Sequence, residues 1–313
     1  MLKNPLFYAK ILLFGEYGII QDSMGLSIPF NFYKGTLVVS KLSDKTDKES
    51  NISLRKFYDY LVSKTSETNL FPQLNLSKFK EDIDEGLTFD SSIPQGFGVG
   101  SSGALVAAVY DKYAITKIEH EKNIEKTDIL KLKNWFGQME SFFHGRSSGL
   151  DPLICYLNLP VLIKSKTDVD TIGIPSQNAD GKGAIFLLDS GSPKDTEPMV
   201  NIFLEKMKNE GFRKVISEQF KKYNDECIKA FLNHDFHPLF NNLKKLSNVV
   251  LEHFKPMIPK TFHKLWQEGI DSNTYYLKLC GSGGGGFILG FAPDYKKAFP
   301  KLKAYNPEVI YTF

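Results

Sequence analysis

The sequence predicts an α+β protein of two domains, and three observations carry this prediction. First, a chain of 313 residues is longer than one hydrophobic core usually supports, so two domains of about 150 residues are expected. Second, short β-type apolar runs bounded by glycine and polar residues occur in both halves of the chain. Third, longer segments between them place apolar residues every three or four positions, as amphipathic helices do.

The first half of the chain predicts strands and helices in succession. Residues 7–20 contain two β-type runs broken by Gly15 and Gly18, which predicts a hairpin. Residues 40–51 are polar and charged and are expected to form a surface loop. The other elements are a helix from 54 to about 66, a strand at 87–93, a helix from 101, a helix over 129–144 ended by Gly145, and a strand at 160–166.

The second half begins after a polar, glycine-containing stretch at residues 167–183, where the domain boundary is expected. The predicted domains are therefore residues 1–178 and 179–313. A strand is predicted at 184–189, and mostly helical sequence follows from 199 to 269, divided near Gly211. Strands at 275–280 and 287–291, a short helix and a last strand at 309–313 complete the chain.

Composition excludes several classes of protein. The net charge of +3, from 39 basic and 36 acidic residues, does not supply the concentrated cationic face that nucleic acid requires. The three cysteines are far apart and have no metal spacing, so neither a disulfide framework nor a zinc site is predicted. No apolar run approaches 18 residues and no secretory leader is evident. We expect a soluble cytoplasmic protein with no nucleic-acid or membrane partner.

The segment from Pro94 to Tyr110 organises the rest of the sequence. Glycines at 96, 98 and 100 permit unusual backbone angles and close approach of a ligand, and Ser101 and Ser102 are good N-cap residues for the apolar helix behind them. Amides at a helix start bind anions, so phosphate is the expected ligand. The spacing fits neither a Walker loop nor a dinucleotide fingerprint. A glycine-rich turn that only caps a buried helix is an equal alternative for this segment taken alone.

Several charged residues in otherwise apolar or turn-forming sequence are candidates for structural or functional contacts. Lys10 and Glu16 interrupt apolar sequence, so they either face solvent or line a cleft. Glu140 and His144 lie one turn apart on the polar side of their helix and are placed to bond each other. Asp151 precedes a proline and is expected to be the N-cap of a short helix, which alone would explain it.

A second glycine-rich loop lies near the end of the chain. Five of the six residues from Gly281 to Gly286 are glycine, which is more than a simple hairpin needs. Such a backbone is expected to pack closely against a ligand or another loop.

Three separated motifs together resemble the GHMP kinase family along nearly the whole chain. The first, an N-terminal strand with Lys and Gly-Glu-His/Tyr, is matched by Lys10 and by residues 15–17. The second, P-x-G-x-G-L-G-S-S-A, is matched from Pro94 to Gly103, and the third, K-x-T-G-A-G-G-G-G, from Lys278 to Gly286. The resemblance implies an α+β fold with an N-terminal domain like ribosomal protein S5 domain 2, a ferredoxin-like C-terminal domain, and an active site in the cleft between them.

Within this family, the segment from Glu140 to Asp151 is most similar to mevalonate kinases, whose pattern is Glu followed by His-Gly-x-Pro-Ser-Gly-hydrophobic-Asp. The sequence departs from the pattern at Tyr17, where His is usual, and at Ser147, Cys280 and Ser282, where Pro, Thr and Ala are usual. These departures concern the acceptor more than the phosphoryl chemistry.

The resemblance implies an ATP- and Mg²⁺-dependent kinase that phosphorylates the 5-hydroxyl of mevalonate. Asp151 would be the general base and Lys10 its cationic partner, while Ser102 and Glu140 would bind Mg²⁺. The implied nucleotide-binding residues are Pro94, Gly96, Gly98, Gly100, Ser101, Ser102, Gly103, Gly281, Gly283 and Gly284. The implied acceptor-binding residues are Glu16, Tyr17, Thr196 and Arg146, with Arg146 a candidate for the acceptor carboxylate.

Two other functions stay open at this point, and a homodimer is a candidate assembly. Phosphomevalonate kinases share Gly-Glu-Tyr and Ser-Ser-Gly, but a phosphorylated acceptor needs extra cations and the chain has only three arginines, at positions 55, 146 and 213. Its many lysines could serve instead. A non-catalytic ligand sensor of the same fold would be expected to lose the base or the metal ligands, and all of these residue types are present.

Overall fold

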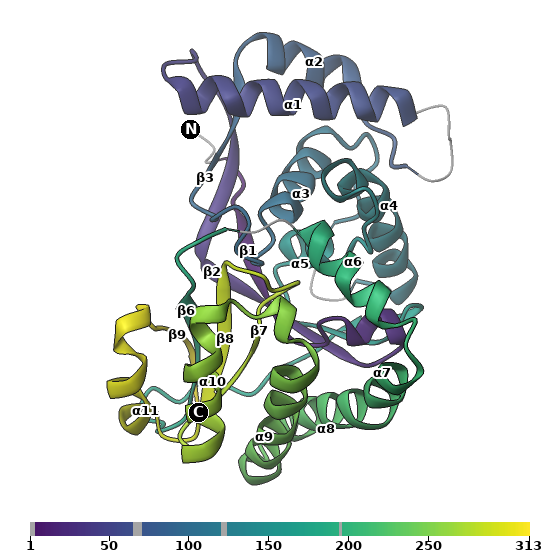
Figure 1. Ribbon diagram of the computed structural model, residues 1–313. Helices are drawn as coiled ribbons and strands as arrows, with labels where there is room; N and C mark the ends of the chain where they lie inside the picture. Colours follow the sequence, from purple (N-terminus) through teal and green to yellow (C-terminus); the bar gives the residue numbers. More distant parts are fainter. Residues whose placement is uncertain (1–3, 65–70, 120–123, 194–195) are drawn as a thin grey trace. The chain divides into compact units, whose positions relative to one another are not determined.

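The computed structural model describes residues 4–64, 71–119, 124–193 and 196–313, with residues 196 and 197 described by their backbone. The chain contains both helices and antiparallel strands, in runs of each kind (Figure 1), and this confirms the predicted α+β class. Among the described residues, no helix has both the length and the apolar character needed to cross a bilayer.

The chain divides into two compact units that interleave along the sequence. Unit 1 consists of Met1–Lys10, Pro29–Pro94 and Gly100–Leu159, and unit 2 consists of Ile11–Ile28, Gln95–Val99 and Pro160–Phe313. Strands β1 (Phe7–Phe14) and β2 (Gly25–Val39) each contribute residues to both units. The predicted contiguous domains, residues 1–178 and 179–313, stay a prediction, because this division follows packing and not sequence order.

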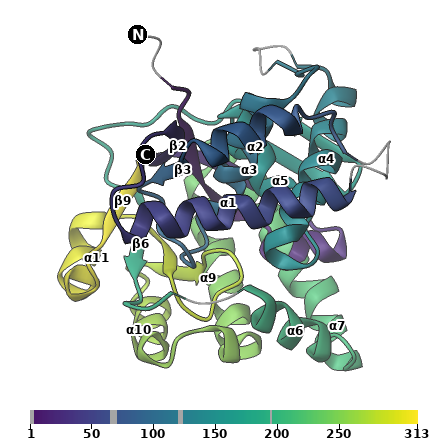
Figure 2. The same ribbon diagram turned by 90° about the horizontal axis from the view of Figure 1, so that it is seen from above.

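The described part of unit 1 contains residues 29–39 of β2, a second strand and five helices. Strand β3 (Leu87–Ser91) pairs antiparallel with β2, from Gly35 opposite Ser91 to Val39 opposite Leu87. The helices are α1 (Lys45–Lys64), α2 (Leu76–Asp84), α3 (Ser101–Tyr113), α4 (Lys126–His144) and α5 (Leu150–Leu157). Figures 1 and 2 both show α1 and α2 side by side.

The core of unit 1 surrounds α3. Every residue of this helix from Gly103 to Tyr110 is buried, which fits its apolar sequence. The Tyr110 ring contacts Phe136 of α4 and Tyr156 of α5 edge-to-face, with centroids 5.1 and 5.2 Å apart. This packing holds α3, α4 and α5 together, and the candidate site residues lie at the starts of α3 and α5 and at the end of α4.

Unit 2 is built on a four-stranded antiparallel sheet in the order β7-β8-β6-β9. Its strands are β6 (Ala184–Asp189), β7 (Tyr276–Leu279), β8 (Phe287–Ala292) and β9 (Glu308–Thr312). A separate ladder joins β4 (Val161–Ser165) to β5 (Asp168–Thr171) and to residues 25–27 of β2. The helices are α6 (Thr196–Lys206), α7 (Glu210–Val215), α8 (Lys221–Leu232), α9 (Phe236–His253), α10 (His263–Ser272) and α11 (Tyr295–Leu302), with α8 beside α9 (Figure 1).

Two sequence predictions about local structure were wrong. Residues 7–20 do not form a hairpin, because the second run forms a 3₁₀ helix, Gly18–Gln21, after a turn at Gly15. Residues 40–51 are not all loop, because α1 begins at Lys45. The Asp44 carboxylate accepts a hydrogen bond from Asp47 N at 2.8 Å, which supplies the capping contact that starts a helix in polar sequence.

Candidate active site

In unit 1, the start of helix α3 lies against Lys10 and Asp151 because two positions lack a side chain. Gly100 is the N-cap with φ of 83°, and a Cβ there would lie 2.9 Å from Lys10 Cγ. A Cβ at Gly103 would lie 2.8 Å from the backbone carbonyl carbon of Asp151. Real Cβ atoms do not approach other atoms this closely, so glycine at both positions is what allows the contact.

The predicted proximity of Lys10 and Asp151 is confirmed. Lys10 Nζ lies 2.9 Å from Asp151 Oδ2, with side chains 3% and 39% exposed. The interpretation in which Lys10 faces solvent is therefore wrong. The buried ammonium holds one carboxylate oxygen in place, while the exposed side of Asp151 leaves this carboxylate accessible to a ligand.

Neither capping prediction for these loops was right. The N-caps are Gly100 and Gly149, both in the left-handed conformation, and not Ser101, Ser102 or Asp151. A glycine adopts this conformation at little cost, so the side chains that follow it lie inside the first helical turn. They are thus available for contacts other than capping their own helix.

Ser102, Glu140, His144 and Ser147 form a polar cluster next to this pair. Ser102 Oγ donates to Glu140 Oε1 at 3.0 Å and lies 3.0 Å from His144 Nε2. Ser147 Oγ donates to Glu140 Oε2 at 2.5 Å. Glu140 and His144 therefore meet through Ser102 and not directly, and Glu140 lies in the interior, not on the polar face of α4.

Burial governs the electrostatics of this cluster. Desolvation and then the nearby charge of Asp151 raise the pKa of Glu140 to about 7, against the lowering effects of Ser147, Ser102 and Lys10. Desolvation lowers the pKa of His144, the charge of Asp151 opposes this effect, and the charge of Lys10 adds to it. A buried carboxylate that holds its negative charge at a cost is a site that a cation would stabilise.

The remaining residues predicted in unit 1 have simpler surroundings. Arg146 is exposed, and its backbone N–H donates to His144 O at 2.7 Å. Pro94 and Ser101 are half-buried. Ser147 was noted in the sequence only as a departure from the family pattern. No sequence signal showed that its hydroxyl reaches the metal-ligand candidate Glu140, because that contact depends on the turn after α4.

In unit 2, the two glycine-rich loops pack backbone against backbone. A Cβ at Gly98 would lie 2.5 Å from Cys280 O, and a Cβ at Gly286 would lie 2.5 Å from Phe97 Cα. Phe287 N donates to Phe97 O at 3.4 Å, and the two rings contact edge-on. The expected close packing of the second loop against another loop is confirmed. The predicted residues Gly96, Gly98, Gly281, Gly283 and Gly284 all belong to these loops, and all have positive φ.

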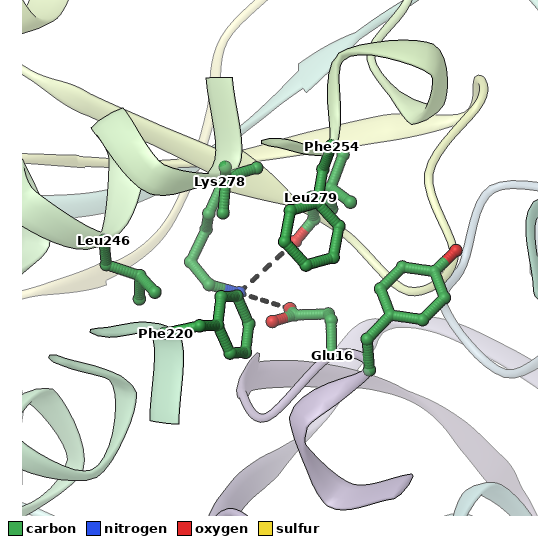
Figure 3. A pocket seen from close by; sticks show the side chains of 8 residues that line it. Glu16, Phe220, Leu246, Phe254, Lys278 and Leu279 are labelled. Carbon is green, nitrogen blue, oxygen red and sulfur yellow. Dashed lines mark hydrogen bonds and ion pairs between the residues drawn. The ribbon is translucent and has the colours of Figure 1, made fainter. Parts of the chain in front are cut away.

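Glu16 and Tyr17, predicted to bind the acceptor, are buried within unit 2. Glu16 forms an ion pair with Lys278, which Figure 3 shows reaching it from strand β7. Tyr17 donates its hydroxyl to Ser282 O at 2.6 Å. Lys278 was identified only as a motif position, although a lysine between leucines in a strand carries the same signal that singled out Lys10.

Thr196, the fourth residue predicted to bind the acceptor, is the first residue of α6, and its side chain lies outside the described residues. Among the described residues, no three His, Cys, Asp or Glu side chains cluster as a metal site. A metal at Ser102 and Glu140 would therefore need further oxygens from a ligand or from water.

The chain is similar in sequence to one family model and in fold to several solved structures. Residues 62–158 match the family model of the GHMP kinases N terminal domain. No curated protein matches the chain. The solved structure of L. major mevalonate kinase in complex with R-mevalonate has a TM-score of 0.63 and 14% identity, covering 97% of this chain and 92% of that chain.

Two other solved structures are similar to the same extent. Streptococcus pneumoniae phosphomevalonate kinase in complex with phosphomevalonate and AMPPNP has a TM-score of 0.63 and 13% identity, covering 100% of this chain and 99% of that one. Lactococcus lactis galactokinase complexed with galactose has a TM-score of 0.65 and 14% identity, covering 98% and 92%. The chain therefore contains a segment, residues 62–158, that matches the GHMP kinases N terminal domain, and it shares the fold of these enzymes over nearly its whole length.

Proposed function

We propose that this protein is an ATP- and Mg²⁺-dependent small-molecule kinase whose acceptor is the 5-hydroxyl of mevalonate. The observation that carries the proposal is the arrangement at the start of α3. The Lys10–Asp151 ion pair packs against Gly100 and Gly103 there, and Ser102 of the same turn contacts Glu140. A base, a cation and a pair of hard oxygen ligands are what phosphoryl transfer to an alcohol requires.

Asp151 has the properties of a general base for the acceptor hydroxyl. Its carboxylate is partly exposed, so a substrate hydroxyl can reach it, and Lys10 Nζ orients it by direct contact at 2.9 Å. As the acceptor oxygen attacks the γ-phosphorus, its proton passes to an Asp151 carboxylate oxygen, and the bond from the γ-phosphorus to the bridging oxygen of ADP breaks. The Lys10 ammonium stabilises the negative charge that develops on the acceptor oxygen.

Ser102 and Glu140 fit a magnesium ion by chemistry and by electrostatics. Both present oxygen, the ligand type that Mg²⁺ prefers, and both Glu140 oxygens are already oriented by the hydroxyls of Ser102 and Ser147. The cost of a negative charge at this buried carboxylate would be offset by a bound cation. Magnesium would supply charge neutralisation to the transferred phosphoryl group.

The nucleotide phosphates are proposed to bind the glycine-rich segments. Residues 96–103 end in the free amides at the start of α3, whose helix dipole favours an anion. Within unit 2, Gly281, Gly283 and Gly284 are proposed to present backbone without side chains to a nucleotide phosphate, with Gly281 beside Gly98. ATP as the donor is supported by the complex of the similar phosphomevalonate kinase with AMPPNP.

Mevalonate is preferred as the acceptor on two grounds. The similar L. major enzyme is a mevalonate kinase in complex with R-mevalonate, and the spacing from Glu140 to Asp151 is that of mevalonate kinases. Phosphomevalonate is the alternative, since the similar Streptococcus pneumoniae enzyme binds it. In unit 1, the exposed Arg146 could serve the carboxylate of either acceptor. The three cysteines are buried and form no disulfide within the described residues, which supports a reducing cytoplasm as the proposed compartment.

The test is to offer purified protein ATP and Mg²⁺ with mevalonate, phosphomevalonate, galactose and homoserine in parallel and to measure ADP release. Turnover of mevalonate alone is the expected result. Asp151→Asn and Lys10→Met are each expected to lower kcat by about 10² to 10⁴, the usual effect of losing a general base or its partner. Lys80→Met is the matched control, because it breaks an exposed ion pair to Asp84 of similar length, 2.7 Å. Near-normal turnover in both site variants would refute the assignment.

A further inference from the structure

Two consecutive side chains after Gly15, those of Glu16 and Tyr17, contact the second glycine-rich loop and the strand that precedes it. Glu16 pairs with Lys278, three residues before Gly281, and the Tyr17 hydroxyl donates to Ser282 O at 2.6 Å, inside the loop. Tyr17 itself has φ of 58°, a conformation that residues with a side chain rarely adopt. All of these residues belong to unit 2.

The carboxylate of Glu16 does not face an open pocket. Glu16 and Lys278 are 6% and 3% exposed, and the cavity beside them has room for about one water molecule. Figure 3 shows the pair enclosed by Phe220, Phe254 and Leu246. A carboxylate in these surroundings is engaged by the protein, and an acceptor of several carbons could not reach it without displacing those side chains.

The ring of Tyr17 is fixed by aromatic neighbours. It stacks on Phe203 with centroids 4.6 Å apart and lies 5.7 Å from Phe254. The hydroxyl is therefore held at one place. It adds a side-chain contact at Ser282 to a loop whose later residues are held by backbone hydrogen bonds, from Gly284 N to Met257 O and from Gly286 N to Ser192 O. Gly281, Gly283 and the glycine after it all have positive φ, and glycine restricts the backbone less than any other residue.

We propose that Glu16 and Tyr17 are positioning residues that fix the Gly281–Gly286 loop, and not residues that contact the acceptor. Glu16 acts through Lys278 on the strand that leads into the loop, and Tyr17 acts on the loop carbonyl at Ser282. This role deepens the proposed kinase function, because a preorganised loop lowers the cost of binding the nucleotide phosphates. It predicts an effect on nucleotide binding and none on acceptor binding.

The test uses Tyr17→Phe, which removes the hydroxyl and keeps the stacked ring. Hydrogen–deuterium exchange is measured for peptides that cover Gly281–Gly286, together with AMPPNP affinity and the KM for ATP and for the acceptor. The matched control is Tyr311→Phe, which removes another buried tyrosine hydroxyl bonded to a distant backbone carbonyl, that of Pro175. Loss of one such hydrogen bond is expected to speed exchange in the loop by about 2- to 13-fold and to weaken AMPPNP binding by a similar factor.

A second variant addresses the ion pair without leaving a lone buried charge. Single substitution of Glu16 would bury the Lys278 ammonium without this partner and could unfold unit 2, whereas Glu16→Gln combined with Lys278→Met removes both charges. The double variant is expected to fold, and to show the same faster loop exchange and the same higher KM for ATP, with the acceptor KM unchanged.

The outcomes separate this proposal from the kinase proposal. Wild-type exchange in the loop of both variants, or a raised acceptor KM with an unchanged ATP KM, would overturn the positioning role. Should the wild-type protein neither bind AMPPNP nor release ADP, the kinase function fails. The exchange measurement would still decide whether Glu16 and Tyr17 fix the loop.

Discussion

Replacing Gly98 with alanine tests whether contact between the two glycine-rich loops is required for nucleotide binding. The added Cβ would lie 2.5 Å from Cys280 O and 3.1 Å from its carbonyl carbon. Gly191 provides a matched control in the same unit, because it has the same φ of 78° and its Cβ would meet nothing within 4 Å. The two substitutions therefore share the backbone strain and differ in the steric clash.

The magnitudes can be worked out from this geometry. Placing an L-residue in the left-handed region costs about 1–2 kcal/mol at either position. Ordinary contacts of a Cβ lie beyond about 3.4 Å, so at Gly98 the loops must separate by roughly 0.9 Å or hold the strain, and overpacking of this kind typically costs about 1–3 kcal/mol. Gly98→Ala is therefore expected to lose about 1–3 kcal/mol more unfolding free energy than Gly191→Ala.

Chemical denaturation and AMPPNP titration of both variants provide the assay. If the loops separate and must close again to bind the nucleotide, a cost of about 1.4 kcal/mol within this range would weaken AMPPNP binding by about 10-fold. Gly191→Ala should bind AMPPNP within about twofold of the wild type. Equal stability and equal affinity in the two variants would refute the argument that this contact shapes the phosphate site.

Three further predictions concern unit 1. Ser147→Ala removes the 2.5 Å hydrogen bond to Glu140, so we expect the Mg²⁺ concentration for half-maximal ADP release to rise several-fold. Gly103→Ala gains about 1 kcal/mol of helix propensity but places a Cβ 2.8 Å from the Asp151 backbone, so thermal unfolding should show a net loss of stability and kcat should fall. Burial alone would raise the pKa of Asp82, but hydrogen bonds from Lys112, Tyr113 and Lys78 lower it below its ordinary value. A carboxyl group whose pKa is lower in the folded than in the unfolded protein adds stability at pH values above its unfolded pKa. This stability is lost as the pH falls through the folded pKa. In melting curves, Asp82→Asn should thus lower Tm at pH 7 and reduce the loss of Tm below about pH 4.

Many helices and strands of the fold could be predicted, because the spacing of apolar residues within each segment indicates its secondary structure. The stripe of α4 and the apolar run of α3 gave both helices correctly, and the terminal β-type runs gave β7, β8 and β9 within a residue or two. The start of α1 could not be predicted from apolar spacing, because that helix begins in charged sequence under the Asp44 cap. The interleaving of the two units was also missed, since it depends on where β1 and β2 pair and not on their composition.

The residues of the candidate site could be predicted from the sequence, but their burial could not. Lys10, Asp151, Ser102 and Glu140 were found through motifs, and the structure shows the short contacts between them that a motif can only imply. What the sequence could not show was burial. The motif position of Glu16 indicated a residue that faces a ligand. Its enclosure depends on Phe220, which precedes α8, and on Leu246 and Val250 of α9, more than 200 residues later in the chain.

The interleaved course of the chain has a consequence for synthesis. Glu16 is among the first residues of unit 2 to leave the ribosome, and Lys278 follows 262 positions later. At the usual elongation rates of about 5–20 residues per second, roughly 13–50 s pass before this ion pair can form. Unit 2 must therefore complete itself late, and a truncated polypeptide that stops at residue 178 would carry Glu16 without the strand that supplies its cation.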